Sequence, residues 1–340
     1  MNKVLKQDIQ DFVSSFELAD ELKSATFLIT GATGLIGSTL IHCLLALDRR
    51  IRIIAPVRNK KKADVIFEDR STKIDLIECD LLTFNYDSIG EVDYIIHCAA
   101  PTSSKFFVEH PVETFNTISQ GTYLLLQYAK KHPIKGMVYL SSLEVYGSIY
   151  DDTESVTEDV QGYIDPLSVR SSYPMAKRAT ETLCCLYAAE YRVPVKIARL
   201  TQTTGAGIAK GDNRIIAQFA RMAAEGKDII LHTKGRAARP YCYITDAISA
   251  ILYILLKGNL GEAYNVANDM TYITARDMAE FLKDKMNPDV RIRFELNDNM
   301  GYAPESKLKL SSEKLEKLGW KSRYELVDIF ENLIEYLREK

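Results

Sequence analysis

The sequence lacks the features that mark several common classes of protein. No stretch approaches the roughly 18 uninterrupted apolar residues of a membrane-spanning helix. Charge of one sign is not in excess, because 43 Lys+Arg face 46 Asp+Glu, unlike the strongly basic surface of nucleic-acid-binding proteins. The six cysteines form no CxxC pair and the five histidines lie far apart, which argues against metal sites and disulfides. These absences predict a cytoplasmic globular protein that binds neither membranes nor nucleic acids.

The acidic residues of segment 1–24 argue against a signal or transit peptide. The segment instead predicts a helical extension, because apolar residues recur at helical spacing and would dock on the rest of the fold. These apolar residues are Leu5, Ile9, Phe12, Val13 and Phe16.

Short β-branched runs alternate with longer helical segments over residues 25–200. The helical segments are 35–47, 110–132 and 173–191. The β-branched runs are apolar on both faces, as buried parallel strands require. These runs are 25–30, 51–56, 74–79, 94–98, 137–141 and 195–200. This alternation predicts an α/β fold with a doubly wound parallel sheet.

The pattern changes after residue 200. Gly and Thr predict a long loop at 201–213, followed by helices at 214–225 and 246–256. Further predicted elements are a strand at 263–267 that returns to the main sheet, a strand at 292–296, a turn near 300–305 and two terminal helices. We therefore expect a dinucleotide-binding domain over 25–200, with later returns near 240–267. Residues 201–340 would form mainly a smaller C-terminal substrate-binding lobe over the carboxyl ends of the strands.

The segment Gly31-Ala-Thr-Gly34-Leu-Ile-Gly37 directly follows the first predicted strand and opens a helix. Glycines at such a turn let the backbone approach a pyrophosphate, and the amino end of the helix supplies N–H donors. Arg58 stands where the second strand usually ends in an acid, so it either contacts an NADP 2′-phosphate or belongs to a solvated basic loop. Asp80, after the third strand, is placed to accept a hydrogen bond from adenine.

Tyr173 and Lys177 are four residues apart, which sets a phenol and an ammonium group on one face of a predicted helix. A tyrosine with an ordinary pKa of about 10 is a poor base at neutral pH, and a nearby cation would lower that pKa. Ser142 lies at the carboxyl end of the preceding strand and can bond the same substrate oxygen. The three residues predict acid–base chemistry at that edge of the sheet.

Six segments occur in the order found in the extended short-chain dehydrogenase/reductases: 31–37, 97–100, 141–147, 173–177, 239–246 and 318–320. From about residue 25 to its end, the chain resembles the NAD-dependent nucleotide-sugar epimerase/dehydratase branch of that superfamily. The resemblance implies a Rossmann-type sheet and an enzyme that acts through a 4-keto sugar. Tyr173 would be the base, and Arg239 would bind the diphosphate of the substrate.

The resemblance also assigns residues to the cofactor and the substrate. The expected cofactor is NAD, with NADP allowed by Arg58, and Gln202 stands where the family has a substrate-binding asparagine. The expected cofactor residues are Gly31, Thr33, Gly34, Leu35, Ile36, Gly37, Arg58, Asp80, Leu81, Ala99, Ala100 and Lys177. The expected substrate residues are Ser142, Tyr173, Gln202 and Arg239.

The reaction depends on the two residues that follow Ser142. The 4,6-dehydratases carry an Asp-Glu pair there, and Leu143 in this chain cannot donate a proton. Glu144 is either a catalytic acid/base or a structural carboxylate. It is retained in sugar-nucleotide decarboxylases, whose basic residue near the C-terminus aligns with Lys307.

An epimerase is the leading prediction for the reaction, and a UDP-glucuronate-type decarboxylase is the alternative. A net NADP-dependent reductase or dehydrogenase comes third. A non-catalytic sensor or scaffold is disfavoured because Ser142, Tyr173 and Lys177 are all present. A homodimer through helices near 110–130 and 173–191 is expected from the resemblance, and apolar residues at 124–126 and Tyr128 are compatible with it.

Overall fold

Seven parallel strands form the central layer of the protein. The structure, a computed structural model, describes residues 1–209, 211–297 and 305–339, without the side chains of 69–71. The order across the sheet is β10-β6-β5-β4-β1-β2-β3, and every neighbouring pair is parallel. The strands are β1 (Thr26–Thr30), β2 (Arg52–Val57), β3 (Ile74–Glu78), β4 (Tyr94–His97), β5 (Gly136–Ser142), β6 (Val195–Leu200) and β10 (Ala263–Val266).

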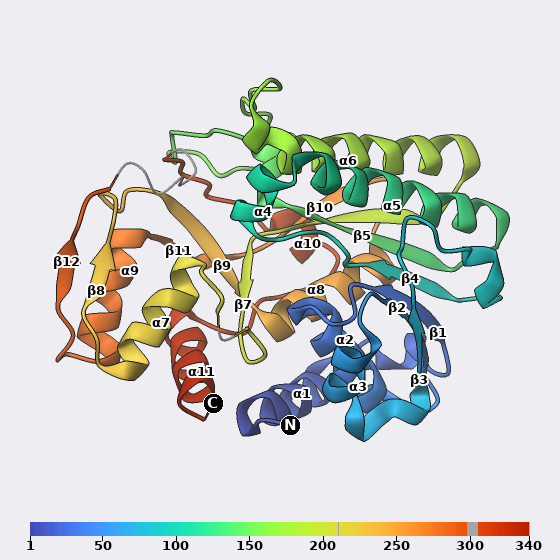
Figure 1. Ribbon diagram of the computed structural model, residues 1–340, viewed down its shortest axis with the longest axis horizontal. Coiled ribbons are helices and arrows are strands. Elements are labelled where there is room, and N and C mark those ends of the chain that lie inside the picture. The colour runs from blue at the N-terminus through green and yellow to red at the C-terminus, as the bar shows by residue number, and fades with distance from the viewer. Residues whose placement is uncertain (210, 298–304, 340) are drawn as a thin grey trace.

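Helices cover both faces of this sheet, as Figure 1 shows. Side chains alternate between the faces, so that Leu28 packs in one core cluster while Phe27 and Ile29 pack in the other. The helices of the Leu28 face are α4 (Ser104–Glu109), α5 (Pro111–Lys131) and α6 (Ser172–Tyr191). The opposite face carries α2 (Leu35–Leu47), α3 (Lys60–Ile66) and α8 (Ile244–Lys257). The predicted doubly wound sheet and the return of β10 to it are both confirmed.

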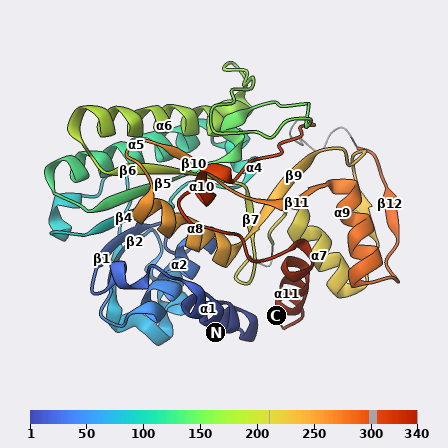
Figure 2. The same cartoon turned by 180° about the vertical axis from the view of Figure 1, so that it is seen from behind.

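Two small sheets and their helices form the remainder (Figure 2). The three-stranded sheet contains β7 (Gln202–Thr204), β9 (Ala238–Tyr243) and β11 (Asn268–Thr274), in the order β11-β9-β7. The two-stranded sheet pairs β8 (Ile229–Leu231) with β12 (Ile292–Phe294). The helices of this part are α7 (Ile215–Glu225), α9 (Ala275–Phe281), α10 (Glu313–Glu316) and α11 (Leu326–Arg338).

The N-terminal extension docks as α1 (Lys3–Ser15), which lies beside the C-terminal helix α11 (Figure 1). Its buried face includes Ile9 and Phe12, as the apolar spacing predicts. Asp8 is also buried and accepts a hydrogen bond from the Tyr243 hydroxyl at 2.8 Å. Within 1–209, 211–297 and 305–339, no helix has both the length and the apolar character needed to cross a membrane.

Sequence reasoning placed some local elements wrongly. Residues 201–213 are not entirely a loop, because β7 pairs with β9. The lysine run after Arg58 is not a loop either: it is the first turn of α3, whose amino end is capped by Asn59. The predicted turn near 300–305 lies, apart from Glu305, outside the described residues.

Candidate active site

A tight turn joins β1 to α2, and it needs glycine at two positions. Gly31 has a φ of +67°, and a Cβ there would lie 2.8 Å from the backbone nitrogen of Ala99. A Cβ at Gly37 would lie 2.3 Å from the Gly31 carbonyl oxygen, so the turn and the helix pack in direct backbone contact. Gly34 is the N-cap of α2, and no side chain caps that helix end. The free N–H donors beside an open backbone fit a dinucleotide pyrophosphate.

The next three strands place the other expected cofactor residues at the same edge of the sheet. Arg58 follows β2 and is exposed, and Asp80 follows β3, where its carboxylate accepts a hydrogen bond from Leu82 N at 2.9 Å. Ala99 and Ala100 follow β4 and are half-buried. Their contacts with a cofactor stay a prediction, as do those of Thr33, Leu35, Ile36 and Leu81.

The structure brings Ser142, Tyr173 and Lys177 together. The Ser142 hydroxyl lies near the Tyr173 phenol, and this contact taken by itself favours a lower pKa of the phenol. The Lys177 ammonium nitrogen lies 5.7 Å from the centre of the Tyr173 ring and donates to the Leu140 carbonyl at 2.6 Å. Tyr173 and Lys177 are both buried on α6, one turn apart, and face the end of β5. The predicted catalytic group is therefore assembled in the folded chain.

Burial dominates the electrostatics of Tyr173. Burial, assisted by the charge of Glu144, raises the pKa of the phenol above its ordinary value, although Ser142 and Arg170 oppose the change. Burial also lowers the pKa of Lys177 to about 8. Desolvation of the phenolate outweighs the charge of Arg170 and the contact with Ser142, so the described residues do not by themselves lower this pKa. The lowering that is expected from a nearby cation together with the positive nicotinamide ring stays a prediction.

Glu144 is held by Arg170, a residue that sequence reasoning missed. The two groups form a bidentate ion pair, with Nη1 3.0 Å from Oε2 and Nη2 3.2 Å from Oε1. The Arg170 guanidinium also lies 5.1 Å from the centre of the Phe107 ring, and Phe107 stacks on Tyr173 at 4.3 Å. Arg170 precedes Tyr173 by three residues, but its pairing with Glu144 closes a gap of 26 residues, so no local pattern pointed to it.

Gln202 and Arg239 stand apart from this group, in the three-stranded sheet. The side-chain oxygen of Gln202 is buried without a hydrogen-bond partner. The Arg239 guanidinium is half-buried and forms no hydrogen bond or ion pair with the described residues. Neither residue contacts Tyr173 or Lys177 through a hydrogen bond within the described chain. Polar groups left unpaired inside a fold are available to a ligand.

His97, at the end of β4, is a structural residue. It is buried, and its Nδ1 lies 2.6 Å from the Thr30 hydroxyl. Burial, together with the charge of Lys177, lowers the pKa of His97 to about 3, so the imidazole is neutral.

A parallel sheet with a glycine turn after its first strand and a tyrosine–lysine pair after its fifth defines a nicotinamide-dependent enzyme of the Rossmann type. The model of the NAD dependent epimerase/dehydratase family matches residues 27–267. The chain therefore belongs to that family. This membership confirms the predicted family resemblance and an NAD-dependent enzyme.

Curated relatives cover most of the chain. UDP-glucuronic acid decarboxylase 6 of Arabidopsis thaliana is 29% identical over 302 residues, which cover 88% of this chain and 84% of the relative. UDP-glucuronic acid decarboxylase 1 of Xenopus tropicalis is 25% identical over 343 residues, with coverage of 99% and 79%.

Solved structures share the fold. The UDP-glucose 4-epimerase of Thermotoga maritima superposes with a TM-score of 0.78 at 22% identity and covers 92% of this chain and 99% of its own. The UDP-glucuronic acid 4-epimerase of Bacillus cereus, solved with UDP-glucuronic acid and NAD, gives 0.77 at 20% identity with coverage of 92% and 99%. These structures confirm the predicted fold class.

Proposed function

We propose that the protein is an NAD(P)-dependent nucleotide-sugar enzyme that works through a 4-keto sugar, and that its reaction is the decarboxylation of a nucleotide-linked uronic acid. The observation that carries this choice over a 4-epimerisation is Glu144, held by Arg170 beside Ser142 and Tyr173. A 5-epimerisation would use the same carboxylate as a base beside C5. The dehydratase alternative is disfavoured, because the preceding position holds the buried Leu143. The relatives named as UDP-glucuronic acid decarboxylases support the proposal.

NAD, held at the Gly31–Gly37 turn, would supply a hydride acceptor and later a hydride donor. Tyr173 would take the proton of the sugar hydroxyl that becomes the 4-keto group, while Ser142 donates a hydrogen bond to the same oxygen. Lys177 is mostly protonated at neutral pH, since its pKa is about 8, and it supplies the positive charge that a phenolate needs. Its ammonium group would also bind the nicotinamide ribose.

Loss of carbon dioxide then follows from the chemistry of a 4-keto uronic acid. The carboxylate is β to the carbonyl, so the C5–C6 bond can break and leave its electron pair on the C4 oxygen. Ser142 and Tyr173 stand where they would stabilise that enolate oxygen. A proton must return to C5, and Glu144 is the side chain at the end of β5 that can carry it.

Epimerisation, the leading prediction from the sequence, is the second candidate. The state of Lys307 favours it. This lysine aligns with the basic residue of decarboxylases, but it is already engaged in an ion pair with Asp152 at 3.0 Å. The Tyr272 hydroxyl donates to the same carboxylate at 2.9 Å. A lysine engaged in this way is less available to a substrate carboxylate than a free one.

Mass spectrometry and NMR of the products test both candidates. The protein is incubated with UDP-, dTDP-, GDP- and CDP-sugars, including UDP-glucuronic acid, with NAD or NADP added in its oxidised or its reduced form. A product lighter by carbon dioxide is expected for the decarboxylase. A product of unchanged mass with an inverted centre identifies the epimerase, and steady consumption of reduced cofactor identifies a net reductase. The two cofactors also test whether Arg58 selects NADP.

We also propose that the protein forms a homodimer through α5 and α6. The Leu125, Leu126 and Tyr128 side chains offered for this interface are buried within one chain and cannot take part. The same two helices instead expose other large apolar side chains, and these support the dimer. They are Val112, Phe115, Tyr123, Leu186 and Tyr191. Sedimentation measures the oligomeric state and tests this dimer.

The cytoplasmic location of the protein stays a prediction.

A further inference from the structure

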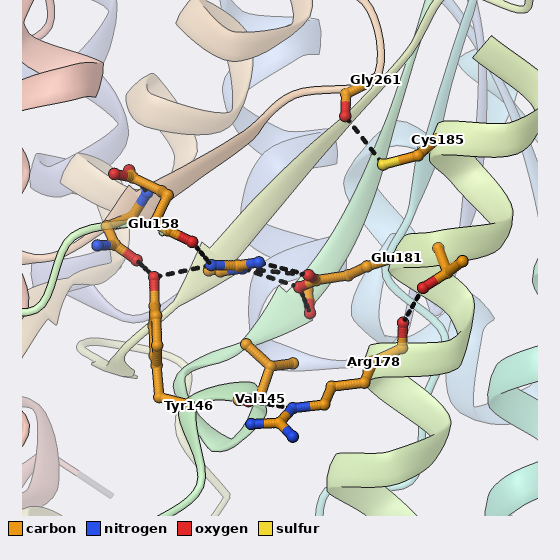
Figure 3. Close-up of polar contacts among 11 residues, drawn as sticks. Val145, Tyr146, Glu158, Arg178, Glu181, Cys185 and Gly261 are labelled. Carbon is orange, nitrogen blue, oxygen red and sulfur yellow. Dashed lines mark hydrogen bonds and ion pairs between the residues drawn. The ribbon is translucent and has the colours of Figure 1, made fainter. Parts of the chain in front are cut away.

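Glu181 lies on α6, one turn beyond Lys177, and it is buried although it carries a charge. Its carboxylate accepts from the Ser141 hydroxyl at 2.5 Å. Arg199 of β6 donates to the same carboxylate from Nη2 at 2.7 Å and from Nε at 3.1 Å. Figure 3 labels Glu181 and draws the contacts of its carboxylate as dashed lines. The two partners, on β5 and β6, tie the helix that carries Tyr173 and Lys177 to two strands of the sheet.

The network continues away from the catalytic group. Arg199 also donates to the Tyr146 hydroxyl at 3.1 Å and to the Glu158 carbonyl at 2.7 Å. The Tyr146 hydroxyl donates to Asn265 Oδ1 at 2.6 Å, and the Glu158 carboxylate accepts from Asn265 N at 2.6 Å. The far end of the network therefore holds the loop after β5 against β10, whereas Glu181 faces the catalytic helix.

Lys177 has no carboxylate ion-pair partner among the described residues, and its hydrogen bond goes to a carbonyl. Glu181 is the largest influence that raises the pKa of this ammonium group against the effect of burial. Titratable groups face Lys177 from its own helix, from β4 and its end, and from β5. They are Tyr173, Glu181 and Cys184 on α6, His97 and Cys98 at the end of β4, and Tyr139 on β5.

We propose that Glu181 is a positioning residue that keeps the positive charge on Lys177 and sets the register of α6 against β5. The inference rests on the proposed acid–base role of Tyr173 and Lys177. Without the carboxylate, Lys177 would lose the largest influence that opposes the effect of burial, and burial favours the neutral amine. Arg199 would at the same time lose the carboxylate that holds α6 against β6. Loss of the Lys177 charge would remove the group that supports a phenolate at Tyr173.

The test compares Glu181→Gln with Glu158→Gln, which changes the far end of the same network. Lys177 is followed by NMR of its ¹³Cε signal, assigned through the loss of that signal in Lys177→Met. We expect the titration of Lys177 to move down by about one pH unit in Glu181→Gln and to stay unchanged in Glu158→Gln. The alkaline limb of kcat/KM would move by the same amount. Coincident titrations in the wild type and Glu181→Gln would overturn the proposal.

The NMR readout separates this inference from the proposed function, because it needs no turnover. A shifted Lys177 titration in a protein that converts no sugar nucleotide would refute the reaction and retain the role of Glu181. If Glu181→Gln does not fold, the double variant Glu181→Leu/Arg199→Met removes both charges and keeps an apolar interior. Its Lys177 should still titrate below the wild-type value, and an unchanged titration there would also overturn the proposal.

Discussion

The polar side chains at the carboxyl end of β5 and those in the three-stranded sheet differ in whether they have hydrogen-bond or ion-pair partners. At the end of β5, Glu144 is paired with Arg170, and Lys177 donates to a backbone carbonyl. In the three-stranded sheet, the Gln202 oxygen is buried without a partner, and the Arg239 guanidinium is unpaired among the described residues. The first region holds its polar groups in place before any ligand arrives, and the second leaves them unsatisfied.

This difference predicts different functions for the two regions. Groups already fixed in the free protein cost little to reorganise during a reaction, which is what transition-state stabilisation needs. Groups left unpaired gain hydrogen bonds only when a ligand arrives, so they contribute to binding. Substitutions at the end of β5 should therefore change kcat, and substitutions in the three-stranded sheet should change KM.

The largest effect is expected for Tyr173→Phe. The variant keeps the ring that stacks on Phe107 but loses the hydroxyl that exchanges the proton, so kcat should fall by about 10³-fold. NAD binding, measured by calorimetry, should stay within about twofold of the wild type, because the glycine turn is untouched. A fully active variant would contradict the acid–base assignment.

Glu144→Gln comes next and separates a catalytic carboxylate from a structural one. It keeps a hydrogen-bond acceptor for Arg170 but cannot carry the proton, so release of carbon dioxide from UDP-glucuronic acid should slow by about 10²-fold. Arg170→Lys is the companion variant, since it keeps the charge but loses the planar fork. Unchanged release in Glu144→Gln would leave Glu144 with a structural role.

Arg239→Ala tests the unpaired region. Loss of charge-assisted hydrogen bonds to a diphosphate should raise KM for the nucleotide sugar by about 10–100-fold, with kcat nearly constant. Arg239→Lys should recover part of the affinity, because a lysine can neutralise a phosphate without the bidentate geometry. Steady-state kinetics measure both variants, and a change confined to kcat would reverse the division between the two regions.

The sequence predicts the main sheet well because its strands are buried on both faces and its helices have clear boundaries. The run 263–267 reads as a returning strand for the same reason, and β10 confirms it. The longer strands β9 and β11, which pair with each other across the three-stranded sheet, were not predicted. The short strands β7 and β8 were missed because three residues carry too little periodicity. Their positions depend on long-range pairing with β9 and β12.

Residues of the candidate site could be predicted where they belong to a motif of fixed spacing. Contacts between residues far apart in the sequence could not be predicted. Ser142, Tyr173 and Lys177 were found because strand ends and helical turns bring them to one edge. The pairing of Glu144 with Arg170 spans 26 residues of irregular chain, so no local pattern marks it. The direction of the Tyr173 pKa shift depends on burial, and sequence spacing carries no measure of burial.

Asp8 lies outside both regions and offers a third case. It is buried and paired, and it is distant in sequence from the catalytic group. Burial raises the pKa of this carboxyl from 3.8 to about 7, although the Tyr243 hydroxyl lowers it. The folded chain therefore holds the Asp8 proton where the unfolded chain releases it. The stability that Asp8 contributes is complete below about pH 4 and is lost as the pH rises towards 7.

Asp8→Asn should remove this pH dependence and leave turnover within about twofold of the wild type, the smallest catalytic effect of the series. The amide can still accept from Tyr243, so α1 stays docked. Denaturant unfolding from about pH 5.5 to about pH 8 should show wild-type stability falling against the variant by about 2 kcal/mol. Asp11→Asn, one turn along the same helix, should keep most of the wild-type pH dependence, because the charge of Asp11 is the smallest of the three influences on the Asp8 pKa. Parallel stability curves for the wild type and Asp8→Asn would mean that the buried carboxyl is already ionised at low pH, and that pairing with Tyr243 outweighs its desolvation.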